Sequence, residues 1–185
     1  ELIAARQNEK TLRIWSSACS AGQEAYSLAM MLREDFSYLH DWTFYIQATD
    51  ISESILERAK LGIYSSMEAH RGLDAHYLQK YFTHVEKGAY QIKPALRQMV
   101  NFSHHNLVGN WPFYPKFDLI MLRNVLIYFN QGVKDAVLQK MYQQMNGSDS
   151  VLILGAAESI YLNDLYKLVP LDKISFYKPN SPVKV

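Results

Sequence analysis

The feature of this sequence that most restricts its fold is the alternation of short apolar segments with longer segments of helical periodicity. Leu12 to Trp15 is apolar, and from Gly22 to Phe36 apolar side chains recur at helical spacing. Thr43 to Ala48 is rich in β-branched and aromatic residues, and Ser52 then stands where it can cap a second helix. Strands that alternate with helices favour a mostly parallel sheet covered on both faces.

The second half of the sequence continues this alternation. Residues 100–104 alternate between apolar and polar side chains, and residues 117–122 contain a continuous apolar run that is typical of a strand buried on both faces. We expect these two segments to be neighbouring central strands. Asn130 is expected to cap a long helix that Gly147 closes, and Ser150 to Gly155 follows as the next strand.

Two further segments complete the predicted fold. Residues 62–97 have an irregular pattern, with a short helix expected to end at Tyr81-Phe82 and a hairpin around Lys87-Gly88, and we interpret them as a small β insertion. After a short helix near Leu162 to Leu165, residues 166–170 and 173–178 are expected to pair as an antiparallel hairpin joined at Leu171-Asp172. The predicted fold class is therefore α/β, a Rossmann-like doubly wound sheet with these two additions.

Composition and charge exclude several classes of function. The 185 residues suit one domain, and the longest apolar runs fall short of the roughly 20 residues that a membrane span needs. The single Cys19 cannot form an internal disulfide, which favours a reducing, cytoplasmic compartment. A net charge of +1 without a basic stripe disfavours a nucleic-acid partner. His104 and His105 point to opposite faces of a strand, so we predict no metal site there.

Polar residues that follow the predicted strands are the candidates for ligand binding, because doubly wound folds bind ligands beyond the carboxyl ends of their strands. Asp50 suits the ribose hydroxyls of a nucleotide, although a helix-capping aspartate explains it equally well. Glu24 suits a cationic ligand, and a helix N-terminus also favours its charge. The small residues of the first turn, Ser17 to Gly22, would let a ligand approach the backbone closely. Asn106-Leu107 follows the next strand of the predicted sheet.

The later strand ends add a second group of candidates. Arg123-Asn124 directly follows the apolar run, where we expect the guanidinium to lie beside a ligand cleft in a bidentate contact or to pair with a neighbouring carboxylate. Tyr128 and Phe129 could stabilise a cation, or lie in the core. Glu158 is a further strand-end polar residue, to which spacing alone assigns no role beyond helix capping.

Three ordered blocks give the sequence a specific resemblance. The blocks LRIWSSACSAGQEAYSLAM, ATDIS and LRNVLIYF, which begin at Leu12, Ala48 and Leu122, resemble the chemotaxis protein-glutamate O-methyltransferase family (CheR type). The resemblance implies a cytoplasmic enzyme that moves a methyl group from S-adenosylmethionine to glutamate side chains on the cytoplasmic helices of chemotaxis receptors, leaving S-adenosylhomocysteine. It also implies that residues 62–97 match a small β-subdomain that in some members docks a receptor peptide.

The same resemblance implies roles for individual residues. Glu24 would hold the amino acid part of the cofactor, Asp50 its ribose, and Asn106 with Leu107 its adenine, while Arg123 and Asn124 would line the cleft and Tyr128 would stand near the transferred methyl group. Gln23, Ala25 and Leu122 replace a glutamate, a proline and a cysteine that are usual in the family.

The family also carries an upstream helical domain that contributes to the cofactor pocket, whereas this chain begins shortly before its first strand. We therefore expect the chain to fold, to bind the cofactor weakly or not at all, and not to methylate a receptor at a normal rate. One alternative is a non-catalytic S-adenosylmethionine-binding signalling or adaptor module. Another is an NAD oxidoreductase, which is disfavoured because the first turn lacks the three-glycine fingerprint.

Overall fold

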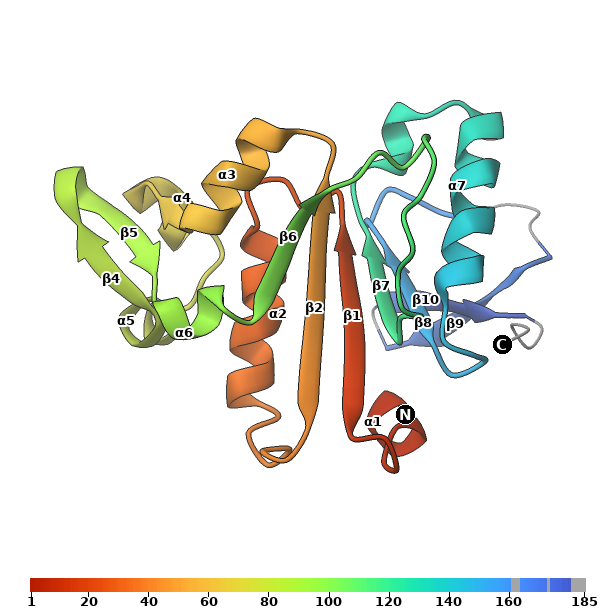
Figure 1. The fold of residues 1–185 in the computed structure, drawn as a ribbon, viewed down its shortest axis with the longest axis horizontal. Coiled ribbons are helices and arrows are strands. Elements are labelled where there is room, and N and C mark those ends of the chain that lie inside the picture. Colours follow the sequence, from red (N-terminus) through yellow and green to blue (C-terminus); the bar gives the residue numbers. More distant parts are fainter. Residues whose placement is uncertain (161–163, 173, 181–185) are drawn as a thin grey trace.

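A seven-stranded sheet forms the centre of the protein, for which the computed structural model describes residues 1–160, 164–172 and 174–180. Its strand order is β6-β2-β1-β7-β8-β10-β9 (Figure 1). The first five strands in that order are parallel, and β10 runs antiparallel to both of its neighbours. The strands are β1 (Thr11–Ser17), β2 (Thr43–Asp50), β6 (Val100–His104), β7 (Leu119–Leu122), β8 (Val151–Leu154), β9 (Tyr166–Leu171) and β10 (Ile174–Pro179).

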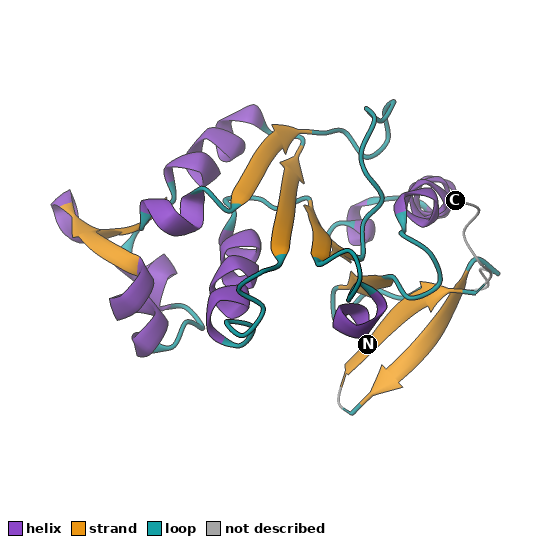
Figure 2. Cartoon of the chain, turned by 60° about the horizontal axis from the view of Figure 1, so that its bottom comes forward, coloured by secondary structure: helices purple, strands orange, loops and turns teal. Residues whose placement is uncertain are grey.

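Helices cover the two faces of this sheet and divide the core in two. The short α1 (Leu2–Ala5) precedes β1, α2 (Gln23–Glu34) and α3 (Glu53–Leu61) follow the first two strands, and α7 (Gln131–Gln144) precedes β8. Ile14 packs with the buried residues of α2, whereas its neighbour Trp15 packs with those of α7. Because successive strand residues point to opposite faces, α2 and α7 lie on opposite sides of the sheet (Figures 1 and 2).

Residues 62–97 contain a second, antiparallel sheet at one end of the molecule (Figure 1). Its strands, in the order β3-β5-β4, are β3 (Ile63–Tyr64), β5 (Ala89–Ile92) and β4 (Phe82–Val85). The hairpin predicted around Lys87-Gly88 is confirmed, with the turn η1 (Glu86–Gly88) between β4 and β5. The short helices α4 (Ser66–His70), α5 (Ala75–Tyr81) and α6 (Pro94–Arg97) flank it.

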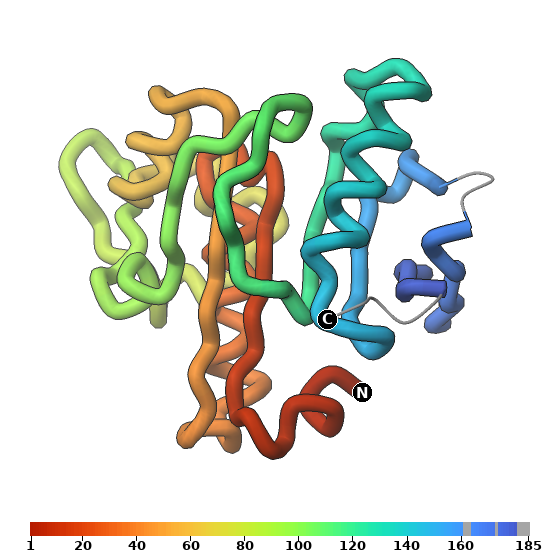
Figure 3. Tube along the Cα trace, turned by 45° about the vertical axis from the view of Figure 1, so that its right-hand side comes forward, coloured from red at the N-terminus to blue at the C-terminus, as the bar shows by residue number. Residues whose placement is uncertain are grey.

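The predicted adjacency of the third and fourth strands of the main sheet is wrong. β6 pairs with β2 at one edge, whereas β7 pairs with β1 in the centre. In residues 105–118 the chain crosses the carboxyl edge without forming a helix and returns along the sheet to β7 (Figure 3). The polar residues of β6 fit its edge position, where side chains need not be buried in an apolar core. The Gln47 side chain of β2 donates hydrogen bonds to Asn101 O and to the Ser103 hydroxyl across the strand pair.

The long helix ends earlier than Gly147, which we predicted to close it. Asn130 caps its start as expected, with its Oδ1 accepting from Val133 N at 3.1 Å. The helix stops at Gln144, because Met145 turns into an extended conformation and forms a parallel bridge with Phe117 in the core. Gly147, at φ 81°, instead serves the turn that leads into β8.

The C-terminal hairpin is confirmed with slightly shifted strands. β9 and β10 pair from Leu171 with Ile174 through Tyr166 with Pro179. The short helix expected near Leu162 to Leu165 falls partly on residues 162 and 163, which lie outside the described residues, and residues 164 and 165 form a turn. The fold class predicted from the sequence, a mostly parallel α/β sheet with an antiparallel C-terminal hairpin and a small β insertion, is the one observed.

Candidate functional site

The carboxyl ends of the parallel strands meet at one edge of the sheet, at the top of Figure 1. The chain order reverses between β1 and β7. The strands β2 and β6 lie on one side of β1, whereas β7 and the strands that follow it in the sequence lie on the other side. Ligands of doubly wound sheets bind at such a reversal. The predicted site residues lie at this edge: Glu24 in the first turn of α2, Asp50 at the end of β2, and the others in the segments that follow β6 and β7.

The first of these loops is tightly folded onto the end of β2. Cys19 N donates to Thr49 O at 2.8 Å, and the backbone takes positive φ at Ala18, Ser20 and Gly22. A Cβ atom at position 22 would lie 3.0 Å from the ring of Phe102. The glycine is therefore required by the packing of α2 against its neighbours, and the loop itself brings backbone to the edge of the sheet.

Asp50 joins the first two loops and does not cap a helix. Its Oδ2 accepts from Ser20 N at 2.8 Å and its Oδ1 accepts from Ser52 N at 3.0 Å. The cap of α3 is the Ser52 hydroxyl, which accepts from Ile55 N. A carboxylate offers about four acceptor positions, so Asp50 retains capacity to accept hydrogen bonds from a ligand.

A cavity of about 220 Å³ lies beside Asp50. It brings together Asp50, Asn106, Leu107 and Tyr128, which we selected from the sequence. Tyr128 has 78% of its surface exposed at the rim of this cavity. The other lining residues are mostly apolar: Ala18, Ile51, His105, Val108, Val125 and Phe129. A mainly apolar hollow with a few polar groups is typical of a small-ligand site. We call it the Asp50 hollow.

Asn106 shapes one side of the Asp50 hollow. Its Oδ1 accepts from Val108 N at 3.0 Å, which closes a turn directly after β6. Leu107 is buried within the same turn, and its carbonyl oxygen accepts from the indole of Trp111. This turn therefore presents a fixed backbone segment to the hollow.

Glu24 and Arg123 contact each other at the same edge of the sheet. Arg123 Nη1 donates to Glu24 Oε2 at 3.0 Å, and the Ser16 hydroxyl donates to Glu24 Oε1 at 2.7 Å. The guanidinium thus pairs with a neighbouring carboxylate, which is the second of the two contacts that we expected, and it uses one nitrogen to do so. Neither Glu24 nor Arg123 lines the Asp50 hollow, and Arg123 instead borders a groove along β7, β8 and β10.

Glu158 is a residue whose importance the sequence did not reveal. Asn124, in the left-handed region at φ 59°, donates its backbone N–H to Glu158 Oε2 at 2.7 Å. Four more backbone N–H groups donate to the same carboxylate. From the sequence, Glu158 could be recognised only as a polar residue shortly after a buried strand. Other residues that accept no backbone hydrogen bonds fit the same description.

Three buried polar groups complete this edge of the molecule. The Ser17 hydroxyl, in a residue 1% exposed at the end of β1, has no hydrogen-bond partner among the described residues. Burial, together with the charge of Asp50, raises the pKa of the Cys19 thiol to about 12, which keeps it protonated. Burial lowers the pKa of His105 to about 4, so its imidazole is neutral. In the described part of the chain, no three His, Cys, Asp or Glu side chains could hold a metal ion.

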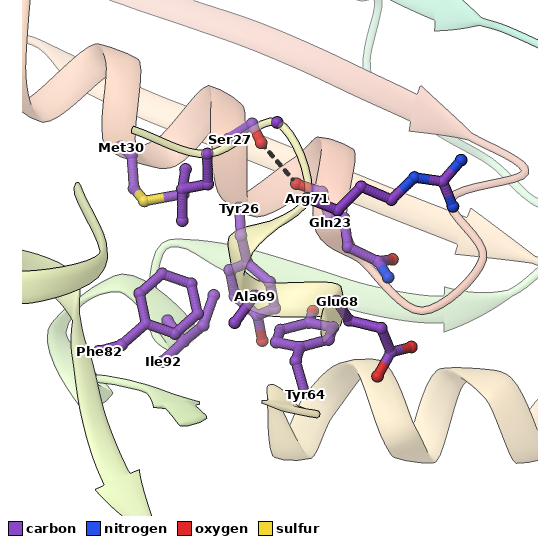
Figure 4. Close-up of a pocket in the computed structure, with 12 residues that line it drawn as sticks. Gln23, Tyr26, Ser27, Met30, Tyr64, Glu68, Ala69, Arg71, Phe82 and Ile92 are labelled. Atoms are coloured by element: carbon purple, nitrogen blue, oxygen red, sulfur yellow. Dashed lines mark hydrogen bonds between the residues drawn. The ribbon is translucent and has the colours of Figure 1, made fainter. Parts of the chain in front are cut away.

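A second cavity, of about 80 Å³, lies between α2 and the small antiparallel sheet (Figure 4). Tyr26 and Met30 of α2 contribute one side, and Tyr64, Phe82 and Ile92 of the small sheet contribute the other. None of the residues that we selected from the sequence lines it. The cavity marks the seam between α2 and the small sheet.

The residues at the carboxyl edge fit an adenosine-containing cofactor. The Asp50 hollow combines apolar walls with a carboxylate, the Glu24 carboxylate lies nearby, and the Ser17 hydroxyl is a buried polar group without a partner in the described residues. Apolar walls suit a base, and carboxylates suit ribose hydroxyls and an ammonium group.

Comparison with known proteins identifies the family. The model described as "CheR methyltransferase, SAM binding domain" matches residues 1–174. Chemotaxis protein methyltransferase 1 of Pseudomonas aeruginosa is 40% identical over 173 residues, which are 91% of this chain and 62% of that protein. The chemotaxis protein methyltransferase of Vibrio anguillarum is 37% identical over 174 residues, 92% of this chain and 63% of that protein.

A third relative, the chemotaxis protein methyltransferase of Listeria monocytogenes, is 38% identical and is covered over 61% of its length. The chain thus spans about three fifths of the curated relatives that it matches. Among the described residues, no helix is long and apolar enough to cross a membrane. The family match covers almost the whole chain, including all the residues that shape the carboxyl edge. The chain belongs to the CheR methyltransferase family, as its S-adenosylmethionine-binding domain.

Proposed function

We propose that this chain is the cofactor-binding domain of an enzyme that methylates glutamate side chains on the cytoplasmic helices of chemotaxis receptors. The observation that carries the proposal is the Asp50 hollow, where Asp50, Asn106, Leu107 and Tyr128 meet at the strand reversal of a chain from the CheR family. The reaction would take place in the cytoplasm, where such receptor helices lie.

Individual residues would hold the cofactor as follows. Asp50 would accept hydrogen bonds from the ribose, because its carboxylate retains acceptor capacity after binding Ser20 N and Ser52 N. Leu107 and the turn of Asn106 would enclose the adenine. Glu24, which the Ser16 hydroxyl and Arg123 hold in place, would face the amino acid part. The cofactor supplies an electrophilic methyl group on a sulfonium.

The chemistry needs little from the protein beyond positioning. A glutamate side chain with an ordinary pKa of about 4.3 is already an anionic nucleophile at neutral pH, so no general base is required. The residues of the cleft would hold the acceptor carboxylate in line with the methyl group and exclude water, since both charges disappear during the reaction. Tyr128, exposed at the rim of the Asp50 hollow, would contact the methyl group or the acceptor.

The small antiparallel sheet of residues 63–92 belongs to the same proposal. We assign residues 62–97 to a subdomain inserted between the second and third strands of the main sheet. A role for it in docking a receptor peptide follows from the family resemblance stated above, and binding of receptor-derived peptides to this domain would test it.

Methyl transfer to receptor fragments tests the function. A longer version that carries an upstream helical domain should transfer labelled methyl groups from S-adenosylmethionine to a receptor cytoplasmic fragment, as base-labile esters. The matched control is the same fragment with its acceptor glutamates replaced by alanine, which should remain unlabelled. If an upstream helical domain contributes to the pocket, residues 1–185 alone should bind S-adenosylhomocysteine more weakly and transfer methyl groups more slowly than the longer version.

The outcomes separate the competing functions. Cofactor binding by the longer version without any transfer would favour a non-catalytic signalling or adaptor module, and calorimetric binding of NAD in place of S-adenosylhomocysteine would favour an oxidoreductase. Equal activity of the two versions would show that the present chain is sufficient for catalysis.

A further inference from the structure

The carboxylate of Glu158 joins two loops at the carboxyl edge of the sheet. Five backbone N–H groups point at it, four from the loop after β7 and one from the loop after β8. Oε2 accepts from Asn124 N at 2.7 Å and Gly155 N at 2.8 Å, and Oε1 accepts from Val125 N at 2.9 Å, Leu126 N at 2.7 Å and Ile127 N at 3.4 Å.

The loop after β7 has few partners of its own for these groups. It leaves the strand at Asn124, which is left-handed, and passes into the 3-10 turn η2 (Leu126–Tyr128). The first N–H groups of such a turn have no carbonyl partner within it. Glu158 supplies that partner from a distant part of the sequence, so the conformation of the loop depends on one side chain.

The glycine at position 155 is an independent sign of this close contact. A Cβ atom there would lie 2.7 Å from Glu158 Oε2 and 2.9 Å from Asn124 N. The second neighbour is backbone and cannot rotate away. The two loops therefore approach so closely that a side chain at position 155 would force them apart.

We propose that Glu158 is a positioning residue for methyl transfer: by holding the backbone of residues 124–127, its carboxylate fixes Tyr128 beside the Asp50 hollow and Arg123 beside Glu24. This inference rests on the proposed function, because Tyr128 matters to the reaction only if a methyl group is transferred there. Displacing a reacting group by about 1 Å can slow a reaction about 100-fold.

Kinetics of the full-length enzyme test this role. Glu158→Gln keeps the shape of the side chain but turns one acceptor oxygen into an NH₂ donor that faces backbone N–H groups. We expect kcat per folded molecule to fall about 10- to 100-fold, with the KM for S-adenosylmethionine changing less than about 3-fold. Glu158→Asp, which keeps both oxygens, should restore part of kcat. A purely structural role would lower the melting temperature and leave kcat unchanged.

Asp149→Asn provides the matched control. Asp149 is exposed and precedes β8, whereas Glu158 follows the same strand at its other end. The control should leave kcat and KM unchanged. If Glu158→Gln also leaves kcat unchanged, Glu158 has no positioning role in catalysis.

Amide hydrogen exchange separates this inference from the proposed function. In the present domain, Glu158→Gln should speed exchange at Val125 and Leu126 by about 10-fold or more, because their acceptor is altered, while amides of α7 exchange as before. Unchanged exchange at these two positions would overturn the inference even if the enzyme is active. Faster exchange, in a protein whose wild type transfers no methyl group, would contradict only the proposed function.

Discussion

Asp50 and Glu158 are two carboxylates in the same kind of position that make different contacts. Each follows a parallel strand, Asp50 at the end of β2 and Glu158 shortly after β8. Asp50 accepts hydrogen bonds from two backbone N–H groups, whereas Glu158 accepts them from five. A carboxylate has about four acceptor positions, so Asp50 has capacity for a ligand and Glu158 does not. Under the proposed function, the comparison separates a carboxylate that would bind the cofactor from one that would hold the site together.

The largest effect on stability should come from removing the carboxylate of Glu158, which accepts more hydrogen bonds than that of Asp50. Glu158→Ala leaves five backbone N–H groups without their acceptor, and we expect the free energy of unfolding to fall by about 2 to 4 kcal/mol. Urea unfolding of the domain measures this, with Asp149→Ala as a control that should stay within about 0.5 kcal/mol of the wild type. A loss below about 1 kcal/mol would mean that water replaces the carboxylate easily.

A methyl group at position 155 should separate the same two loops from the other side. Gly155→Ala places a Cβ atom within 2.9 Å of Asn124 N, and overpacking of this kind destabilises proteins by about 1 to 3 kcal/mol. Thermal unfolding checks the size of the effect. The control is Gly88→Ala, whose Cβ would meet nothing within 4 Å and whose positive φ alone is disfavoured. Because Gly155 itself does not have a positive φ, backbone conformation does not explain a loss at that position, and a Gly155→Ala variant as stable as the wild type would contradict the close contact of the two loops.

Removing the carboxylate of Asp50, which accepts fewer hydrogen bonds, should affect ligand binding more than stability. Asp50→Ala is expected to weaken binding of S-adenosylhomocysteine by about 1 to 3 kcal/mol, as measured by calorimetry at saturating protein. The bonds from Ser20 N and Ser52 N predict a smaller loss of stability, about 1 kcal/mol. Unchanged affinity in a folded variant would make Asp50 a loop-joining residue like Glu158.

The smallest effect on stability should come from changing the ion pair between Arg123 and Glu24. Arg123→Lys changes a partly exposed contact made through one nitrogen, and such pairs contribute about 0 to 1 kcal/mol. A bidentate contact, which lysine cannot make, would predict a larger effect than the contact through one nitrogen that the structure shows. Paired measurements of unfolding and cofactor affinity check this, and a larger drop in affinity than in stability would indicate that the guanidinium contacts the ligand.

Sequence patterns predicted the fold well wherever one local rule decided the structure. Helical spacing located α2, and the side chains of Ser52 and Asn130 identified two helix starts because capping is a local interaction. The sequence patterns gave wrong predictions where contacts between residues distant in the sequence decide the structure. Met145 leaves the helix to pair with Phe117, and the order of β6 and β7 depends on which strand pairs with β1.

The candidate site shows the same division. Position after a strand was enough to select Asp50, Asn106 and Tyr128, because all parallel strands end at one edge. Position could not distinguish Glu158, whose role depends on five N–H groups that lie up to 34 residues away in the sequence. The contact between Glu24 and Arg123 likewise joins residues far apart in the sequence.

The most direct test of this account is a nuclear magnetic resonance titration of the domain with S-adenosylhomocysteine at millimolar concentration, where even weak binding shifts amide signals. The account predicts that the shifted signals cluster around the Asp50 hollow, at Ser20, Ile51, Leu107 and Val108. Shifts confined to the cavity between α2 and the small sheet would contradict binding of the cofactor at the carboxyl edge of the sheet.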